Sequence, residues 1–486
     1  MPRSSQIANF PSVNLSMGWE MAKSNRFYFF RLHFETLTLH LKQNRYETKT
    51  RTVTLKKTRP GHTCQLGNIM TGKLNVFVLA VVVVWYSGQV AAQTSDQYAE
   101  EARAILADTR LKTAFDSIDK SRDQILGEWT AITEINAPSG QEGQRAAYIE
   151  QLLRKYNLQS IRYDSAGNLI ATRSGTGGGP TVVFDAHMDT VFQPGLKIKA
   201  VIRDGEIYAP GVGDDTRNIE ALLASIRALN EAGIKTKGDI VFLFSTAEET
   251  TMGGARQFVS DNKGKIDQYV ALDGGYEGFT YGGIGINWYR HHFLGPGGHT
   301  RSQTPPFSAT LPLARAIERI YQLKVPNNPP SNLNIGMLGG SEVVNAKASD
   351  AWFTVDLRST DNAVIADLDK KIALILSEEA AREGMQLKTE VISASPAAIL
   401  PGNRDSSLVR MTEAIHIAMG FENPPITNTG SNNSSAALRA GISSISTGAG
   451  PCSNSHSVKE SCEIEPFYRG IKKIIAMEIA LAKSRD

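Results

Sequence analysis

The sequence contains several short apolar segments, and each ends next to acidic or histidine side chains. Residues 181–184 precede His187-Met188-Asp189, residues 239–246 precede Glu248-Glu249, and residues 268–272 precede Asp273. Segments with helical spacing, over 217–232 and 253–262, lie between these runs. Short apolar runs are typical of strands buried on both faces, and their alternation with helices is typical of a parallel sheet. The pattern therefore predicts an α/β fold whose polar side chains gather at the carboxyl edge of a mainly parallel central sheet.

A segment with a different pattern interrupts this alternation. Strands with one exposed face are expected over 284–296 and near 331–346, 350–358 and 386–393, with helices over 308–322 and 361–383. Beyond residue 400 the first pattern returns, with a helix over 405–419, a strand over 443–447 and a helix over 466–483. The sequence thus predicts an α+β unit over 288–397, inserted between two parts of one domain, 93–287 and 398–486.

The amino-terminal region differs in charge from the rest of the chain. Residues 1–69 hold 11 Lys/Arg and 3 Asp/Glu, a net of +8, so the +3 of the whole chain leaves −5 for residues 70–486. A mildly acidic folded part gives no electrostatic support to nucleic-acid binding. Residues 70–92 combine a lysine, an apolar run over 76–86 and the ending Val90-Ala91-Ala92, which is the pattern of a signal peptide. The apolar run is too short to span a bilayer comfortably.

A signal peptide over 70–92 leads us to expect that translation starts at Met70 and that residues 1–69 are an untranslated or unstructured basic extension. A buried strand or helix over 76–86 is the alternative. On the first interpretation the mature chain begins near Gln93, is exported to the periplasm or secreted, and keeps no stable membrane anchor. Its only cysteines are then Cys452 and Cys462. An oxidising compartment favours a disulfide between them, and two buried thiols are the alternative.

The polar motifs together contain two imidazoles and several carboxylates, which is the ligand set of a two-zinc hydrolytic site. Each motif alone has an ordinary structural explanation, because an acidic pair before a helix can cap it and a loop histidine is usually solvated. A pair of like charges such as Glu248-Glu249 is costly beside a buried strand unless a cation is present. The candidate motifs occur in one order, each near an expected strand end: His187–Asp189, Asp214-Asp215, Glu248-Glu249, Asp273 and His456. Their joint occurrence favours an enzyme of the hydrolase class.

The chain resembles the dizinc metallopeptidases of the aminoacylase, peptidase T and glutamate carboxypeptidase family. The matching segments lie within residues 130–486 and read FDAHMDTV at 184–191, GVGDD at 211–215, STAEE at 245–249, ALDGG at 271–275, GPGGHT at 295–300, VDLRS at 355–359 and NSHSVKE at 454–460. This resemblance implies a zinc-peptidase catalytic domain with an inserted lid and dimerisation domain. It also implies hydrolysis of a peptide or N-acyl amino acid amide bond. An exopeptidase that acts on small peptides is the preferred interpretation.

The resemblance assigns five residues to two Zn²⁺ ions, for which Co²⁺ or Mn²⁺ could substitute. One ion would be held by His187 and Asp273, and the other by Glu249 and His456. Asp214 would bridge both ions, and the peptide bond that follows it would be cis.

Five further residues receive roles from the same resemblance. Glu248 would be the general base, and Asp189 would brace the first histidine ligand. His299, on the inserted unit, would stabilise the oxyanion, often by reaching across a homodimer. Arg358 and Asn432 would contact the substrate.

Two departures from the family pattern leave the substrate open. Residues 216–218 read Thr-Arg-Asn where the family commonly has Lys-Gly, and residues 430–433 read Gly-Ser-Asn-Asn where it often has Gly-Ser-Asp. A related aminopeptidase family has the same ligand order without a lid, but the long separation between Asp273 and His456 favours the lid-bearing family. A non-catalytic relic, used as a binding or dimerisation module, is the other alternative. The presence of Glu248 and of every ligand motif argues against it.

Overall fold

The computed structural model describes residues 97–483, apart from 159, 302–307 and 342, together with the backbone of short strands within residues 13–53. These strands form two small sheets, ordered β1-β4-β5 and β2-β3. Their bounds are β1 Val13–Asn14, β2 Gly18–Ser24, β3 Phe27–His33, β4 Leu37–Lys42 and β5 Thr48–Val53. The predicted signal peptide over 70–92 lies outside the described residues, as does the rest of the predicted extension over 1–69.

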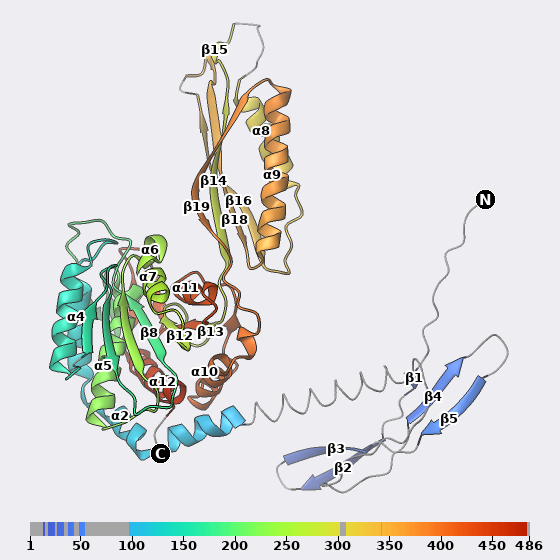
Figure 1. Cartoon of the computed structure of the whole chain (residues 1–486). Helices are drawn as coiled ribbons and strands as arrows, with labels where there is room; N and C mark the ends of the chain where they lie inside the picture. Colours follow the sequence, from blue (N-terminus) through green and yellow to red (C-terminus); the bar gives the residue numbers. More distant parts are fainter. Residues whose placement is uncertain are drawn as a thin grey trace. The chain divides into compact units, whose positions relative to one another are not determined.

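The main sheet has eight strands in the order β20-β13-β21-β12-β8-β11-β7-β6. Figure 1 labels β8, β12 and β13 of this sheet. Their bounds are β6 Ser160–Tyr163, β7 Leu169–Arg173, β8 Val182–His187, β11 Ile240–Ser245, β12 Gln268–Leu272, β13 Phe279–Thr280, β20 Ile426–Thr427 and β21 Ser443–Thr447. The central strands β21, β12, β8 and β11 are parallel, and antiparallel pairings flank them on both sides. The predicted α/β fold with a mainly parallel sheet is confirmed.

Helices pack on both faces of this sheet (Figure 1). Those of the larger core are α2 Thr109–Lys120, α3 Arg122–Glu134, α4 Gly143–Lys155, α5 Arg217–Glu231, α10 Ser407–Ala418 and α12 Ile464–Ala482; those of the smaller core are α7 Gly253–Asp261 and α11 Ser434–Arg439. Strand β8 shows why its sequence is apolar throughout, because Val182 and Phe184 enter the larger core while Val183 enters the smaller one. Among the described residues, no helix is both long enough and apolar enough to cross a membrane.

A second, antiparallel sheet is formed by residues between β13 and β20 (Figure 1). Its order is β16-β18-β14-β19, with bounds β14 Gly285–Leu294, β16 Ser331–Gly340, β18 Asp350–Ser359 and β19 Gln386–Ser395. The helices α8 Thr310–Tyr321 and α9 Asn362–Arg382 share a separate hydrophobic core with it. The two-residue strands β15 Gly298–His299 and β17 Ala346–Lys347 pair beyond β14. The predicted boundary at residue 288 falls inside β14.

The two connections between the main sheet and this inserted unit are bonded to each other. The amide of Gly283 donates to the carbonyl of Ala398 at 2.8 Å, and the amide of Ala398 donates to the carbonyl of Gly283 at 2.9 Å. Strands β13 and β20, which lie on either side of the insertion in sequence, are neighbours in the main sheet. The chain therefore leaves and re-enters the main sheet at adjacent positions.

A small sheet carries the loop that contains His456. Its order is β22-β23-β10-β9, with bounds β9 Val201–Arg203, β10 Glu206–Tyr208, β22 Cys452–Ser453 and β23 Ser461–Glu463. Cys452 and Cys462 face each other across β22 and β23, with their Cα atoms 4.1 Å apart, and form a disulfide. The disulfide predicted from the sequence is confirmed, and it closes the loop that presents the histidine.

Candidate metal centre

The candidate ligands converge at the carboxyl edge of the main sheet. His187 is the last residue of β8, and Asp273 follows β12 directly. Glu248 and Glu249 begin α6, Glu248–Thr251, just after β11. Because β8, β11 and β12 are parallel neighbours, their ends lie side by side. The sequence-based prediction that these side chains meet is therefore confirmed.

Asp214 lies between the two imidazoles of the site. Its Oδ1 is 2.9 Å from Nε2 of His187, and its Oδ2 is 3.2 Å from Nε2 of His456. The same nitrogen of His456 is 3.1 Å from Oε2 of Glu249. The peptide bond between Asp214 and Asp215 is cis, which confirms the prediction made from the resemblance. The two oxygens of one carboxylate thus face different histidines, as a bridging ligand requires.

His187 belongs to two clusters of potential ligands, one with Asp214 and Glu249 and the other with Glu248 and Asp273. One potential ligand atom each from His187, Glu248 and Asp273 lies within 4.8 Å of the others, as does one each from His187, Asp214 and Glu249. Glu248 is only 9% exposed, so its carboxylate lies inside the site. The geometry places Glu248 among the ligands; its role as a base rests on the resemblance and on the mechanism proposed below.

Asp189 connects the first histidine to the Glu248-Glu249 pair. Its Oδ1 accepts the amide hydrogen of Glu248 at 2.9 Å, and its Oδ2 accepts that of Glu249 at 3.2 Å. Oδ2 also accepts the hydroxyl of Ser139 at 2.6 Å. Nδ1 of His187 lies 3.4 Å from Oδ1 and 3.1 Å from the main-chain oxygen of Asp189. The Asp189 carboxylate therefore forms hydrogen bonds with the backbone of Glu248 and Glu249, while its distance to the His187 imidazole is longer.

Two acidic residues to which we assigned no role from the sequence hold the Asp214 turn. Glu460 accepts amide hydrogens from Gly211, Gly213 and Asp214 at 2.8–2.9 Å. Asp215 accepts the amide hydrogen of His187 at 3.0 Å. Glu460 belongs to the same matched segment as His456, and Asp215 to that of Asp214, and this is the only sequence signal that pointed to them.

Electrostatics in the site show a crowded set of buried acids. Burial, with the charge of Asp214 adding to it, raises the pKa of Asp273 to about 6 and that of Glu249 to about 7. Burial also raises the pKa of Glu248 well above its ordinary value. For Asp214 burial acts in the same direction, but hydrogen bonds with His187 and His456 outweigh it and lower the pKa. Without a cation, these carboxylates do not all ionise readily at neutral pH.

The residues present fit the metal that the resemblance implies. Imidazole nitrogens and carboxylate oxygens are ordinary zinc ligands. Oε1 of Glu249 is buried and has no hydrogen-bond partner among the described residues, so it is available to a cation. The raised pKa values of Glu249 and Asp273 give the same indication, because a nearby cation would stabilise their ionised forms.

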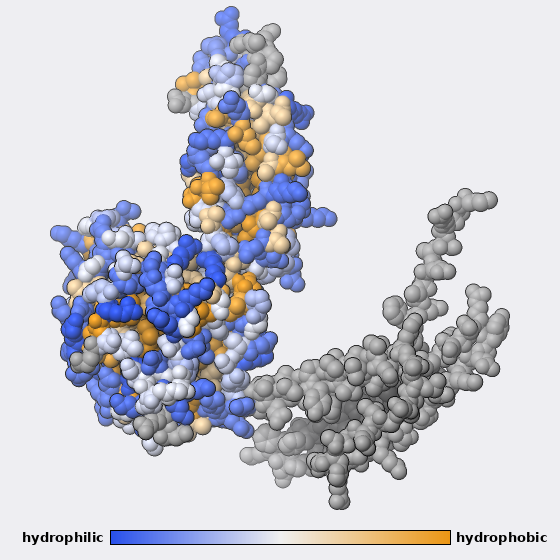
Figure 2. Space-filling view, in the orientation of Figure 1, coloured by the Kyte–Doolittle hydropathy of each residue, from blue (hydrophilic) through white to orange (hydrophobic). Residues whose placement is uncertain are grey.

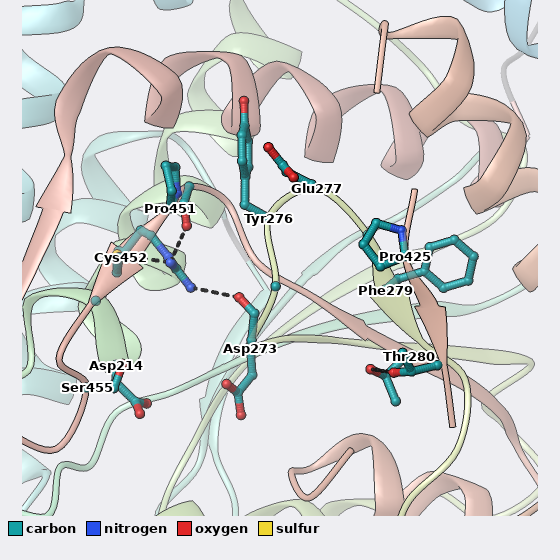
Figure 3. Close-up of a pocket in the computed structure, with 17 residues that line it drawn as sticks. Asp214, Asp273, Tyr276, Glu277, Phe279, Thr280, Pro425, Pro451, Cys452 and Ser455 are labelled. Carbon is teal, nitrogen blue, oxygen red and sulfur yellow. Dashed lines mark hydrogen bonds between the residues drawn. The ribbon is translucent and has the colours of Figure 1, made fainter. Parts of the chain in front are cut away.

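A cavity of about 570 Å³ adjoins the centre (Figure 3). Asp214 and Asp273 line one part of it, and Phe279, Thr280 and Pro425 line another. The cavity thus joins the candidate metal ligands to a partly apolar wall, which is the usual composition of a small-molecule site.

Comparison with known proteins identifies the family. A model of the peptidase family M20/M25/M40 matches residues 183–477, which is more than half of the chain. The chain belongs to this family. Members of the family are metal-dependent, typically on zinc, in agreement with the cluster described above.

The individual relatives are distant. Carboxypeptidase G2 from Pseudomonas sp. (strain RS-16) is 27% identical over 41% of this chain and 51% of its own length. A peptidase M20 domain-containing protein from Schizosaccharomyces pombe is 23% identical over 60% of this chain and 76% of its own length. The first curated relatives are therefore matched over about half of their length or less.

Solved structures share the fold over nearly their whole length. A tripeptidase from Staphylococcus aureus has a TM-score of 0.67 at 22% identity and covers 74% of this chain and 99% of its own. Human carnosine dipeptidase 1 has a TM-score of 0.60 at 13% identity, covering 77% of this chain and 99% of its own. At this identity the likeness shows a common fold, with its catalytic domain and inserted domain.

Three residues that the family resemblance assigned to the site make their hydrogen bonds and ion pairs with residues outside it. His299 is exposed on β15, and its Nδ1 accepts the amide hydrogen of Arg301. Arg358 pairs with Asp356 on the same strand at 3.0 Å. Oδ1 of Asn432 accepts hydrogen bonds from the amide and hydroxyl of Ser434 at the start of α11. Their assigned roles stay predictions.

Removing the disulfide is expected to weaken both the fold and the metal centre of this family member. The replacement Cys452→Ala with Cys462→Ala should lower the free energy of unfolding by about 2–3 kcal/mol, because closing a short loop restricts the unfolded chain. It should also weaken zinc binding, because the loop carries His456. Thermal melting and zinc content measure the two effects, and reduction of the wild type should reproduce them. An unchanged melting temperature would contradict the prediction.

Proposed function

We propose that this chain is a dizinc exopeptidase that hydrolyses amide bonds in small peptides or N-acyl amino acids. The observation that carries the proposal is the position of Asp214, whose two oxygens face His187 and His456. Such a carboxylate can hold two ions on either side of itself. Membership of the peptidase family supports the reaction class, and the names of its relatives, a carboxypeptidase among the sequences and a tripeptidase among the structures, support small peptides as substrates.

The mechanism follows from what surrounds the ligands. Two Zn²⁺ ions would make a water molecule more acidic and polarise the scissile carbonyl. Glu248 is buried next to His187 and Asp273, which supports it as the base that would accept the proton of the attacking water and deliver it to the leaving amine. The hydrogen bond from its amide to Asp189 fixes the start of α6, so the base keeps its orientation.

The proposal is tested with purified protein. The zinc-loaded mature chain is expected to carry about two zinc ions and to hydrolyse at least one member of a panel of dipeptides, tripeptides and N-acyl amino acids. Chelation should abolish turnover, and added Zn²⁺, Co²⁺ or Mn²⁺ should restore it. Zinc binding without hydrolysis of any class would favour the alternative of a binding or dimerisation module. If only peptides with a free amino terminus were hydrolysed, the result would favour the specificity of the lidless aminopeptidases.

We also propose a homodimer formed through the inserted unit. Hydrophobic side chains lie on the surface of this unit (Figure 2), and Met337, Leu338 and Val391 are each more than half exposed. His299 lies beyond the end of β14 opposite its connection to the main sheet, and a ten-residue strand is roughly 30 Å long. We therefore expect the imidazole of His299 to reach the metal centre of a second copy of the chain.

A complementation experiment tests the role of His299. His299→Ala is expected to lower kcat by about 10²–10³, the loss typical of an oxyanion donor. When His299→Ala protein is mixed and reassembled with Glu248→Gln protein, activity should rise well above that of either alone, because a mixed dimer has one intact site. His292→Ala, a change on the same unit, is the matched control and should retain normal kcat. Absence of recovery in verified mixed dimers would place His299 in its own chain's site.

Export is the last part of the proposal, and it rests on the sequence of residues 70–92. Mass spectrometry of the native protein is expected to find an amino terminus near Gln93 and no peptides from residues 1–69. Detection of peptides from residues 1–69 would show that the longer chain is made. Cell fractionation should place the activity in the periplasm or the medium.

A further inference from the structure

Arg217 is a buried cation beside the metal centre, and none of the roles considered so far uses it. It is the first residue of α5, three positions after Asp214, and it is only 5% exposed. In the sequence it was a departure from the family pattern. Its side chain lines the cavity described above, together with Asp214 and Asp273.

The guanidinium contacts two chain segments that carry proposed ligands. Nη2 donates to the carbonyl of Gly274, the residue after Asp273, at 3.4 Å. Nη1 donates to the carbonyl of Gly450 and to Sγ of Cys452 at 3.0 Å. Cys452 opens the disulfide loop of His456, while Arg217 itself follows the Asp214 turn. One planar group therefore joins three segments, each of which bears a ligand.

On the side that packs against the chain, glycines leave room for the Arg217 side chain. A Cβ at Gly448 would lie 2.8 Å from Nη2 of Arg217, and one at Gly450 would lie 3.6 Å from its Cδ. A Cβ at Gly213, in the Asp214 turn, would lie 2.8 Å from both sulfur atoms of the disulfide. Glycines therefore allow the guanidinium and the disulfide to pack directly against the ligand segments.

The contacts of Arg217 indicate that it acts through the geometry of its hydrogen bonds rather than through an ion pair. Across the described part of the chain, no ion pair of Arg217 with a carboxylate lies within 4.0 Å, although Asp214, Asp215, Asp273 and Glu460 are near enough to influence it electrostatically. Nη1 and Nη2 donate to carbonyls and to sulfur, and the buried Nε has no hydrogen-bond partner among the described residues. No carboxylate is therefore occupied by this guanidinium. A lysine would keep the charge but has no rigid fork that reaches two segments at once.

We propose that Arg217 is a positioning residue that holds the Asp273 and His456 segments against the Asp214 turn, so that the ligands are preorganised for both ions. This inference rests on the proposed metal centre. It does not require that the substrate be known, because its first consequence is retention of zinc.

The test compares Arg217→Lys with Arg217→Gln. Both variants are expected to lose zinc to a chelator at least about tenfold faster than the wild type, since loss of supporting contacts commonly costs 10–100-fold in metal affinity. With excess zinc, kcat should remain reduced while KM changes little. Free-thiol labelling of the unfolded, unreduced proteins should show an intact disulfide in each.

Arg173→Lys is the matched control. Arg173 is also a buried arginine that donates to a main-chain carbonyl, that of Ile234, but it lies on β7 away from the ligands. This variant should lose thermal stability without faster zinc loss. Zinc retention at the wild-type rate in both Arg217 variants would overturn the proposal. Normal zinc retention in Arg217→Lys alone would assign the effect to charge. Equally fast zinc loss in Arg173→Lys would assign the effect to general destabilisation. Either result would also overturn the proposal.

The same experiment separates this inference from the proposed function. If the wild type retains zinc but hydrolyses no substrate, the proposed activity fails while the difference in zinc loss still decides the role of Arg217. If the wild type binds no zinc, both fail.

Discussion

Replacing Glu248 with Gln is expected to lower kcat by about 10²–10⁴, because general acid–base catalysis contributes a factor of this size. The amide keeps the shape of the side chain but cannot accept the proton of the attacking water. The amide hydrogen bond from residue 248 to Asp189 involves the backbone and should survive the change. Steady-state kinetics on a substrate found in the panel, with zinc content measured on the same sample, makes the comparison.

Zinc content decides what the loss in Glu248→Gln means. If Glu248 is a base, the variant should hold as much zinc as the wild type. Glu249→Gln is the matched comparison, because that side chain contacts His456 and should lose zinc as well as activity. Full activity in Glu248→Gln would contradict the proposed mechanism. Loss of zinc from this variant would show that Glu248 is a ligand.

Asp214→Asn is expected to produce the largest loss of metal. A neutral amide offers one oxygen, so it cannot face His187 and His456 with two acceptors. We expect zinc affinity to fall by more than about 100-fold, beyond the 10–100-fold typical of losing a supporting residue. Titration with a competing chelator measures the affinity, and kcat should fall with the bound metal.

A control acid shows whether this effect is specific. Asp164 holds a turn by accepting amide hydrogens from Ala166 and Asn168, so Asp164→Asn disturbs a comparable network outside the metal ligands. It should reduce stability and leave zinc binding unchanged. Wild-type zinc affinity in Asp214→Asn would contradict the assignment of Asp214 as the bridging ligand.

The central strands could be predicted closely because burial on both faces leaves a plain signal. The strands expected over 268–272 and 443–447 have these bounds in the structure. Strands β13 and β20 were missed, because each has two residues and no apolar run that marks it. Their pairing depends on two segments that an entire inserted unit separates in sequence, and periodicity carries no information about such a contact.

The convergence of the candidate ligands could be predicted for a related reason, while the residues that support them could not. Motifs at the ends of neighbouring parallel strands must meet, so His187, Glu249 and Asp273 converge as expected. Glu460 binds main-chain amides, which every residue offers, so its partners leave no trace in the sequence. Arg217 was first interpreted as a difference that affects specificity, and its contacts with Gly274 and Gly450 emerged only from the fold.

The hydrogen bonds between Gly283 and Ala398, which join the two connections to the inserted unit, have a consequence for how such proteins diverge. Because the two connections already form an isolated antiparallel bridge, a chain that lost everything between them could be rejoined by a tight turn of a few residues. Strands β13 and β20 would keep their pairing, and the ends of β8, β11 and β12 would be undisturbed. Gain or loss of the inserted unit would then be a local event at the edge of the sheet, and proteins with and without this unit could share one candidate metal centre.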